Sequence, residues 1–107
     1  MPQFDDREKG EEARFALTAE MEFKAHARRN RLLGVWAAEL MGITGDEARA
    51  YAAEVVAADF AEPGHEDVVR KIAADFKAKG LTVPDAVIRQ KLEQLLAVAK
   101  EQVVAEG

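Results

Sequence analysis

The sequence of 107 residues contains no cysteine and no serine, and it has only two histidines. Without cysteine, the chain has no disulfide, no thiolate metal site and no cysteine nucleophile. The side-chain hydroxyl groups belong to Thr18, Thr44, Thr82 and Tyr51. Each threonine stands where a helix can begin, so helix capping explains it. Because two of the common nucleophile types are missing, we expect no covalent hydrolase and no catalytic residues.

Metal and phosphate motifs are also missing. His26 and His65 are far apart in the chain, and neither belongs to a His-Glu-x-x-His pattern. The acids that follow His65 fit the first turn of a helix, where they complement the helix dipole. The segment from Gly42 to Gly45 lacks the lysine of a phosphate-binding loop, although weak ATP or ADP binding at a helix start stays open. We expect no metal and no cofactor.

The overall charge is negative, with a net charge of -5 at pH 7. Nucleic-acid binding draws most of its affinity from phosphate neutralisation, so the charge argues against a nucleic-acid partner. No apolar run reaches the roughly 18 residues that a membrane span needs, and no apolar segment follows the charged start as in a signal peptide. These features predict a cytoplasmic protein that is not inserted in a membrane.

Glycines and prolines divide the chain into four expected helices. The first runs from Thr18 to Met41 and ends at Gly42, since glycine readily adopts positive φ. The second begins at Thr44, which forms a capping-box pattern with Glu47, and it runs to the break at positions 63–64.

The third and fourth expected helices carry clear apolar stripes. The third ends before Gly80, and the fourth begins near Pro84, because proline suits a first turn. The two stripes are Val68, Val69, Ile72 and Phe76, and then Ile88, Leu92, Leu95, Leu96 and Ala99. No alternating pattern or hairpin turn indicates a strand. The sequence therefore predicts an all-α four-helix bundle over residues 18–107, with Trp36, Phe60 and Phe76 as the largest core side chains.

Residues 1–17 have a different character. Seven of the eight residues from Asp5 to Glu12 are charged, so this segment cannot bury enough apolar surface to order alone. Phe4 and Phe15 are eleven residues apart, which would place both rings on one face of a helix. Two interpretations stay open: a frayed start of the first helix, or a mobile, intrinsically disordered segment that folds on a partner.

A basic cluster follows between positions 24 and 31, and its cations occupy more than one helix face. One interpretation is a solvated face that offsets the excess of acid. The other is a docking patch for an acidic partner surface, which raises the association rate more than the affinity. A nucleic-acid-binding module would use the same cations, and the net charge counts against it. The candidate residues are Lys24, Arg28, Arg29 and Arg31.

Several runs resemble one family in a single register. They are Phe4 to Glu8, Phe23 to Gly42, Val55 to Phe60, Gly64 to Val68, and the pair Arg70 and Lys71. Together they are similar to the zeta subunit, the ATPase inhibitor of α-proteobacterial F-type ATP synthases. The resemblance implies a four-helix bundle and a non-enzymatic regulatory function, the inhibition of ATP hydrolysis by the F1 sector.

The resemblance also implies a mechanism and its partners. An N-terminal arm would enter an interface between the α and β subunits, reach the γ shaft and block rotation, while the bundle docks outside. The protein would then be peripheral, on the cytoplasmic side of the membrane-bound synthase. The expected arm contacts are Phe4, Asp5, Asp6, Arg7, Glu8, Lys9, Glu11, Glu12, Arg14 and Phe15.

Overall fold

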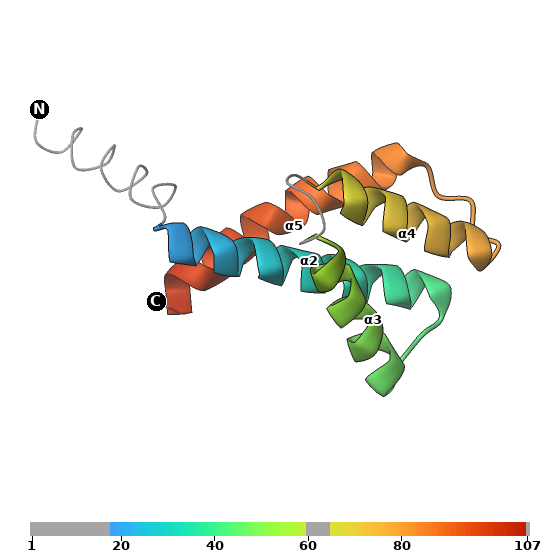
Figure 1. Cartoon of the computed structure of the whole chain (residues 1–107), viewed down its shortest axis with the longest axis horizontal. Coiled ribbons are helices and arrows are strands. Elements are labelled where there is room, and N and C mark those ends of the chain that lie inside the picture. Colours follow the sequence, from blue (N-terminus) through green and yellow to red (C-terminus); the bar gives the residue numbers. More distant parts are fainter. Residues whose placement is uncertain (1–17, 60–64, 107) are drawn as a thin grey trace, which may run out of the picture.

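The computed structural model describes residues 18–59 and 65–106, and every regular element in these ranges is an α-helix. The elements are α2 (Ala19–Met41), α3 (Gly45–Ala58), α4 (Glu66–Ala78) and α5 (Asp85–Glu106) (Figure 1). Helix α2 contacts the other three, so it is the central element of the domain. The prediction of an all-α fold with four helices is confirmed.

Both ends of α2 are formed as the sequence predicts. The Thr18 hydroxyl oxygen accepts a hydrogen bond from the Met21 N–H over 3.1 Å. At the other end, Gly42 has φ 75°. The Ile43 N–H then reaches back to the Ala38 carbonyl over 2.9 Å, which closes the last turn.

The predicted capping box at the start of α3 is wrong. Thr44 is the N-cap residue, but its side chain makes no capping hydrogen bond. The next residue, Gly45, has φ 63°, a left-handed value. The backbone therefore enters α3 along a path that differs from the one a capping box requires. The expected core residue Phe60 and the break at positions 63–64 lie outside the described residues.

The connection between α4 and α5 follows the prediction closely. The Leu81 N–H donates to the Phe76 carbonyl over 2.8 Å, and the Gly80 N–H donates to the Lys77 carbonyl over 3.0 Å. These two bonds, with Gly80 at φ 76°, form a Schellman motif. Pro84 stands immediately before α5 and fixes where this helix begins.

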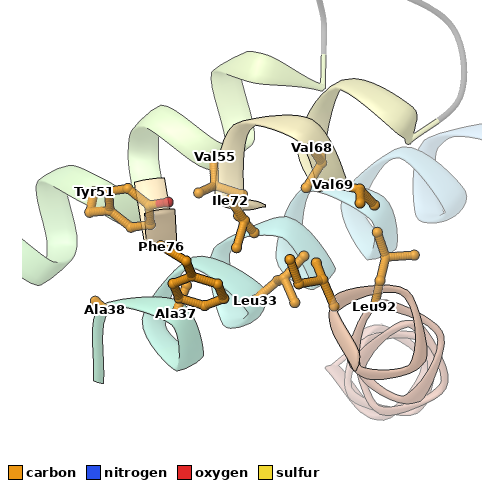
Figure 2. Packing of buried hydrophobic residues seen from close by; sticks show 11 residues of the cluster. Leu33, Ala37, Ala38, Tyr51, Val55, Val68, Val69, Ile72, Phe76 and Leu92 are labelled. Atoms are coloured by element: carbon orange, nitrogen blue, oxygen red, sulfur yellow. The ribbon is translucent and has the colours of Figure 1, made fainter. Parts of the chain in front are cut away.

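The main core lies where α2, α3, α4 and the first half of α5 meet (Figure 2). Phe76 is 1% exposed and is the largest apolar side chain in it. Trp36, predicted as a core residue, is only partly buried and packs its ring edge-to-face with Phe76, at 5.8 Å between centroids. The buried face of α2 carries small residues there, so the indole lies at the rim of the core. The buried members are Leu33, Ala37, Ala38, Tyr51, Val55, Val68, Val69, Ile72, Phe76, Ile88 and Leu92.

Helices α2 and α3 come unusually close at Gly34. A Cβ atom at this position would lie 2.7 Å from the Ala52 Cα and 3.2 Å from Val55 Cγ2. Real side chains do not tolerate the first of these distances. The absence of a side chain at Gly34 therefore sets how near the two helices can pack.

A second, smaller cluster joins the start of α2 to the end of α5. Ala25 packs with Ala99 and Val103, and Met21 lies against them. The two helices are antiparallel, so the N-terminal end of α2 and the C-terminal end of α5 meet at one end of the domain (Figure 1). Val103 lies beyond Ala99, the last residue of the apolar stripe predicted for this helix.

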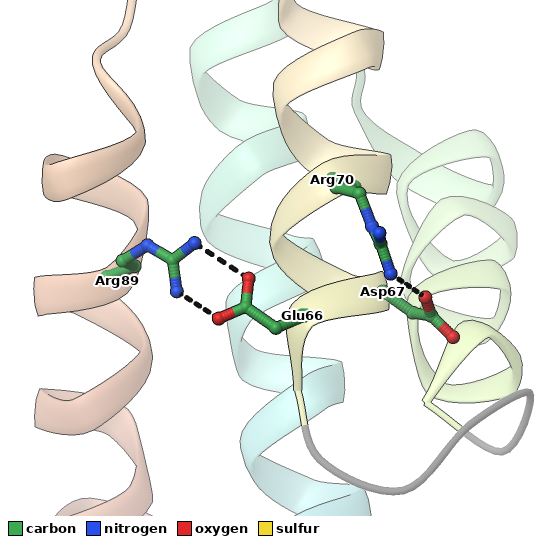
Figure 3. A network of polar contacts seen from close by, with 4 residues as sticks. All are labelled: Glu66, Asp67, Arg70 and Arg89. Atoms are coloured by element: carbon green, nitrogen blue, oxygen red, sulfur yellow. Dashed lines mark hydrogen bonds and ion pairs between the residues drawn. The ribbon is translucent and has the colours of Figure 1, made fainter.

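Polar contacts between helices complete the domain. The Arg89 guanidinium donates to both carboxylate oxygens of Glu66 over 2.6 and 2.7 Å, which ties α5 to the start of α4 (Figure 3). The Tyr51 hydroxyl donates to Asp75 over 2.7 Å and joins α3 to α4. Burial of the phenol and this hydrogen bond raise the pKa of Tyr51, so the hydroxyl stays protonated and keeps donating.

Candidate functional site

The residues expected to form the N-terminal arm, from Phe4 to Phe15, lie outside the described residues. The described chain begins at Thr18, the N-cap of α2. Any segment that precedes it is therefore attached at the end of the domain where α2 and α5 meet.

The structure brings three of the four predicted basic residues together. Lys24, Arg28 and Arg31 are separated by four and three residues on α2, so they share one face of the helix. Lys24 and Arg31 are exposed, and Arg28 is partly buried. All three line a groove of about 400 Å³, which we call the basic groove. Its other lining residues are Phe23, Ala27, Val56 and Glu106.

Arg28 is held by the end of α5. Its guanidinium forms a fork with Glu106: one nitrogen bonds Oε2, and the other bonds Oε1 over 2.7 Å. This hydrogen-bonded pair raises the pKa of Arg28 and lowers the pKa of Glu106. Lys24 lies 3.8 Å from the exposed carboxylate of Glu20, and its charge also acts on Glu106. Lys24 and Arg31 therefore carry the accessible positive charge of the groove.

Arg29 does not belong to this surface, because it is 2% exposed. Its Nε donates to the Asn30 side-chain oxygen over 3.0 Å, and a terminal nitrogen lies 3.5 Å from Asp59 Oδ2. Loss of hydration lowers the pKa of Arg29, and the charge of Asp59 opposes that shift. Arg29 thus ties α2 to the end of α3 and is removed from the predicted docking patch.

A sequence signal for the buried position of Arg29 exists. Ala25, Arg29, Leu33 and Ala37 recur every four residues, and all four are buried. This spacing places the cation in the apolar stripe of α2. Its charge does not distinguish Arg29 from the neighbouring cations, whereas its position in this stripe does.

The histidines form no metal centre in the part of the chain that the structure describes, where no group of three potential ligands converges. His65 is the N-cap residue of α4. His26 lies on α2, where lost hydration and the charges of Arg29 and Lys100 lower its pKa. None of the helices within 18–59 and 65–106 is long and apolar enough to cross a membrane.

Comparison with known proteins assigns the chain to a family. Residues 1–102 match the family ATPase inhibitor subunit zeta. A structure solved by NMR in solution shares 57% sequence identity and a TM-score of 0.72, and the match covers 81% of this chain and 99% of that one. No relative was found among proteins with curated functions. The match across nearly the whole length shows that the chain belongs to the zeta family of ATPase inhibitors of the F1FO ATP synthase, and not to a family of enzymes.

Proposed function

We propose that residues 1–17 are the inhibitory element of this zeta-family protein. This segment inserts at an interface between the α and β subunits of F1, reaches the γ subunit and blocks rotation in the direction of hydrolysis. The family match carries the proposal, because it includes residues 1–17 and extends through nearly the whole chain. The polar networks of the described helices tie these helices to one another, which fits a structural role for the domain.

We assign the helical domain the role of an anchor outside that interface, on the cytoplasmic side of the membrane-bound synthase. Lys24 and Arg31 are the exposed cations that would face an acidic surface of F1, with Arg28 between them. Complementary charge raises the association rate. Once the domain is docked, the tether keeps the inhibitory segment at an effective concentration on the order of millimolar, which offsets part of the free energy lost in ordering it.

The test is ATP hydrolysis by isolated cognate F1, measured with the intact chain and with a chain that lacks residues 1–17. The intact chain is expected to suppress hydrolysis and the truncated chain to leave it unchanged. Circular dichroism verifies that the truncated chain keeps its helices. A third chain carries the same seventeen residues in scrambled order, so its composition and charge match those of the intact protein.

The scrambled chain separates a specific segment from a merely charged one. It should fail to inhibit, because the two phenylalanines no longer share a helix face. Inhibition by the truncated chain at the level of the intact one would disprove the assignment to residues 1–17. Inhibition by the scrambled chain would show that charge alone suffices.

A further inference from the structure

The basic groove stands out on a chain whose net charge is -5. Three cations and one carboxylate line it, together with the apolar side chains of Phe23, Ala27 and Val56. A mixed surface of this kind fits an acidic helix that also carries apolar groups.

A second groove, of about 330 Å³, leads from the start of α2 to the basic groove. Thr18, Glu20, Met21 and Val103 line it, and it shares Lys24 and Glu106 with the basic groove. A chain that leaves Thr18 and turns back over α2 therefore meets a path along α2 that passes the end of α5 and then Val56 of α3.

The segment that precedes Thr18 has the matching charge. Residues 1–17 hold five acidic and three basic side chains. We propose that in the free protein these residues fold back as a helix onto the basic groove. They then cover the surface that was proposed to face F1.

The spacing of the acidic residues in this segment supports the fold-back. Asp5, Glu8 and Glu12 are separated by three and four residues, which puts them on one face of a helix. The three cations of the groove are separated by four and then three residues, which is the same spacing in reverse order.

If the chain reverses direction near Thr18, a helix formed by residues 1–17 runs antiparallel to α2 with the same rise per residue. The three acids then lie opposite the three cations. Glu12 then lies beside Lys24, and Asp5 lies beside Arg31, about 20 Å along α2 from the turn. The intermediate pair is Glu8 and Arg28. Since Arg28 already binds Glu106, the two outer pairs supply most of the attraction.

We call the form with residues 1–17 folded back on the basic groove the closed form. Its ion pairs stabilise it only weakly. Exposed ion pairs contribute roughly 0–1 kcal/mol each, so the tether has to supply the local concentration. The contact therefore opens readily when another acidic surface competes for Lys24 and Arg31. Given the proposed function, docking of the groove on F1 would release the inhibitory segment next to its target.

Paramagnetic relaxation in the full-length protein tests the closed form, and no ATP synthase is needed. Because the chain has no cysteine, Gln3→Cys provides a single site for a nitroxide label. We expect the amide signals from Arg31 to Val35 to lose intensity relative to the reduced label. They should recover at an ionic strength of 1 M, where the Debye length falls to about 3 Å.

Charge reversal supplies the matched controls. Lys24→Glu with Arg31→Glu should restore the signals at low salt. Lys77→Glu with Lys79→Glu makes the same change in net charge on exposed residues at the end of α4 and should leave the broadening intact. Adding Asp5→Lys and Glu12→Lys to the groove variant should bring the broadening back.

Broadening that survives the groove variant or high salt would overturn the proposal, and so would an absence of broadening at low salt. A sample that mixes labelled protein with isotope-enriched unlabelled protein should show none, and broadening there would assign the groove to a second copy. Since these readouts come from the free protein, their failure leaves the inhibition assay to decide the proposed function independently.

Discussion

Replacing Gly34 with alanine tests how closely α2 and α3 pack. The added methyl group would lie 2.7 Å from the Ala52 Cα, a backbone atom that cannot move without shifting α3. It would also lie 3.2 Å from both the Ala52 Cβ and Val55 Cγ2. The substitution therefore forces the two helices apart at the centre of the domain.

Two effects of opposite sign determine the result. Alanine favours a helix over glycine by about 1 kcal/mol, whereas overpacking of a core destabilises it by about 1–3 kcal/mol. The backbone contact cannot be relieved by a rotamer change, so we expect the second effect to prevail. The expected net loss in the free energy of unfolding is up to about 2 kcal/mol, which lowers Tm by roughly 4–8 °C for each kcal/mol.

Urea unfolding measures this loss, with Trp36 fluorescence and far-UV circular dichroism as separate probes. Trp36 is the only tryptophan, and its contact with Phe76 makes it sensitive to loosening of the core. Ala53→Gly, at an exposed position of α3, isolates helix propensity and should lower stability by about 1 kcal/mol. A gain in stability for Gly34→Ala would refute the close approach of the helices.

Four further substitutions address the buried ion pair, pH and the N-terminal segment. Arg29→Met should reduce the free energy of unfolding by about 3 kcal/mol in urea, because Asp59 then lacks its cation; adding Asp59→Asn should restore much of it. The lowered folded-state pKa of His26 means that the unfolded chain binds more protons as the pH falls below about 6.5, so stability should decrease there. His26→Gln should flatten that part of the curve in melts at several pH values, and an unchanged curve would contradict the assignment. Gly10→Ala removes about 1 kcal/mol of helix penalty, so less protein should half-inhibit F1, by roughly five-fold at most because the folded-back free form gains the same stabilisation; weaker inhibition would argue against a helical bound state.

Much of the fold was predictable because local signals agreed with the packing. Gly42 and Gly80 adopt positive φ where the apolar stripes end, and Pro84 marks the start of α5. Thr44 misled because the capping-box pattern says nothing about Gly45, whose left-handed φ changes the path of the chain. Trp36 misled because its size predicted burial, whereas the face of α2 at that level is filled by small residues.

The candidate surface was only partly predictable, because it depends on pairs that are distant in sequence. The sequence identifies the cations of α2, but Arg28 meets Glu106 and Arg29 meets Asp59 only after the helices pack. Ala25 and Ala99 join α2 to α5, but alanine is only weakly hydrophobic, so the sequence does not predict their contact. The assignment of inhibition to the N-terminal residues rests on family membership, and it stays a prediction.

The central place of α2 has a mechanical consequence. If the segment before Thr18 is held against a rotating shaft, every pull on it enters the domain at the N-cap of this helix. Because α2 contacts α3, α4 and α5, it cannot be peeled away from one neighbour at a time. Load applied in shear along a helix must break many contacts together, whereas unzipping breaks them in sequence. The attachment point thus suits an anchor that has to hold under torque.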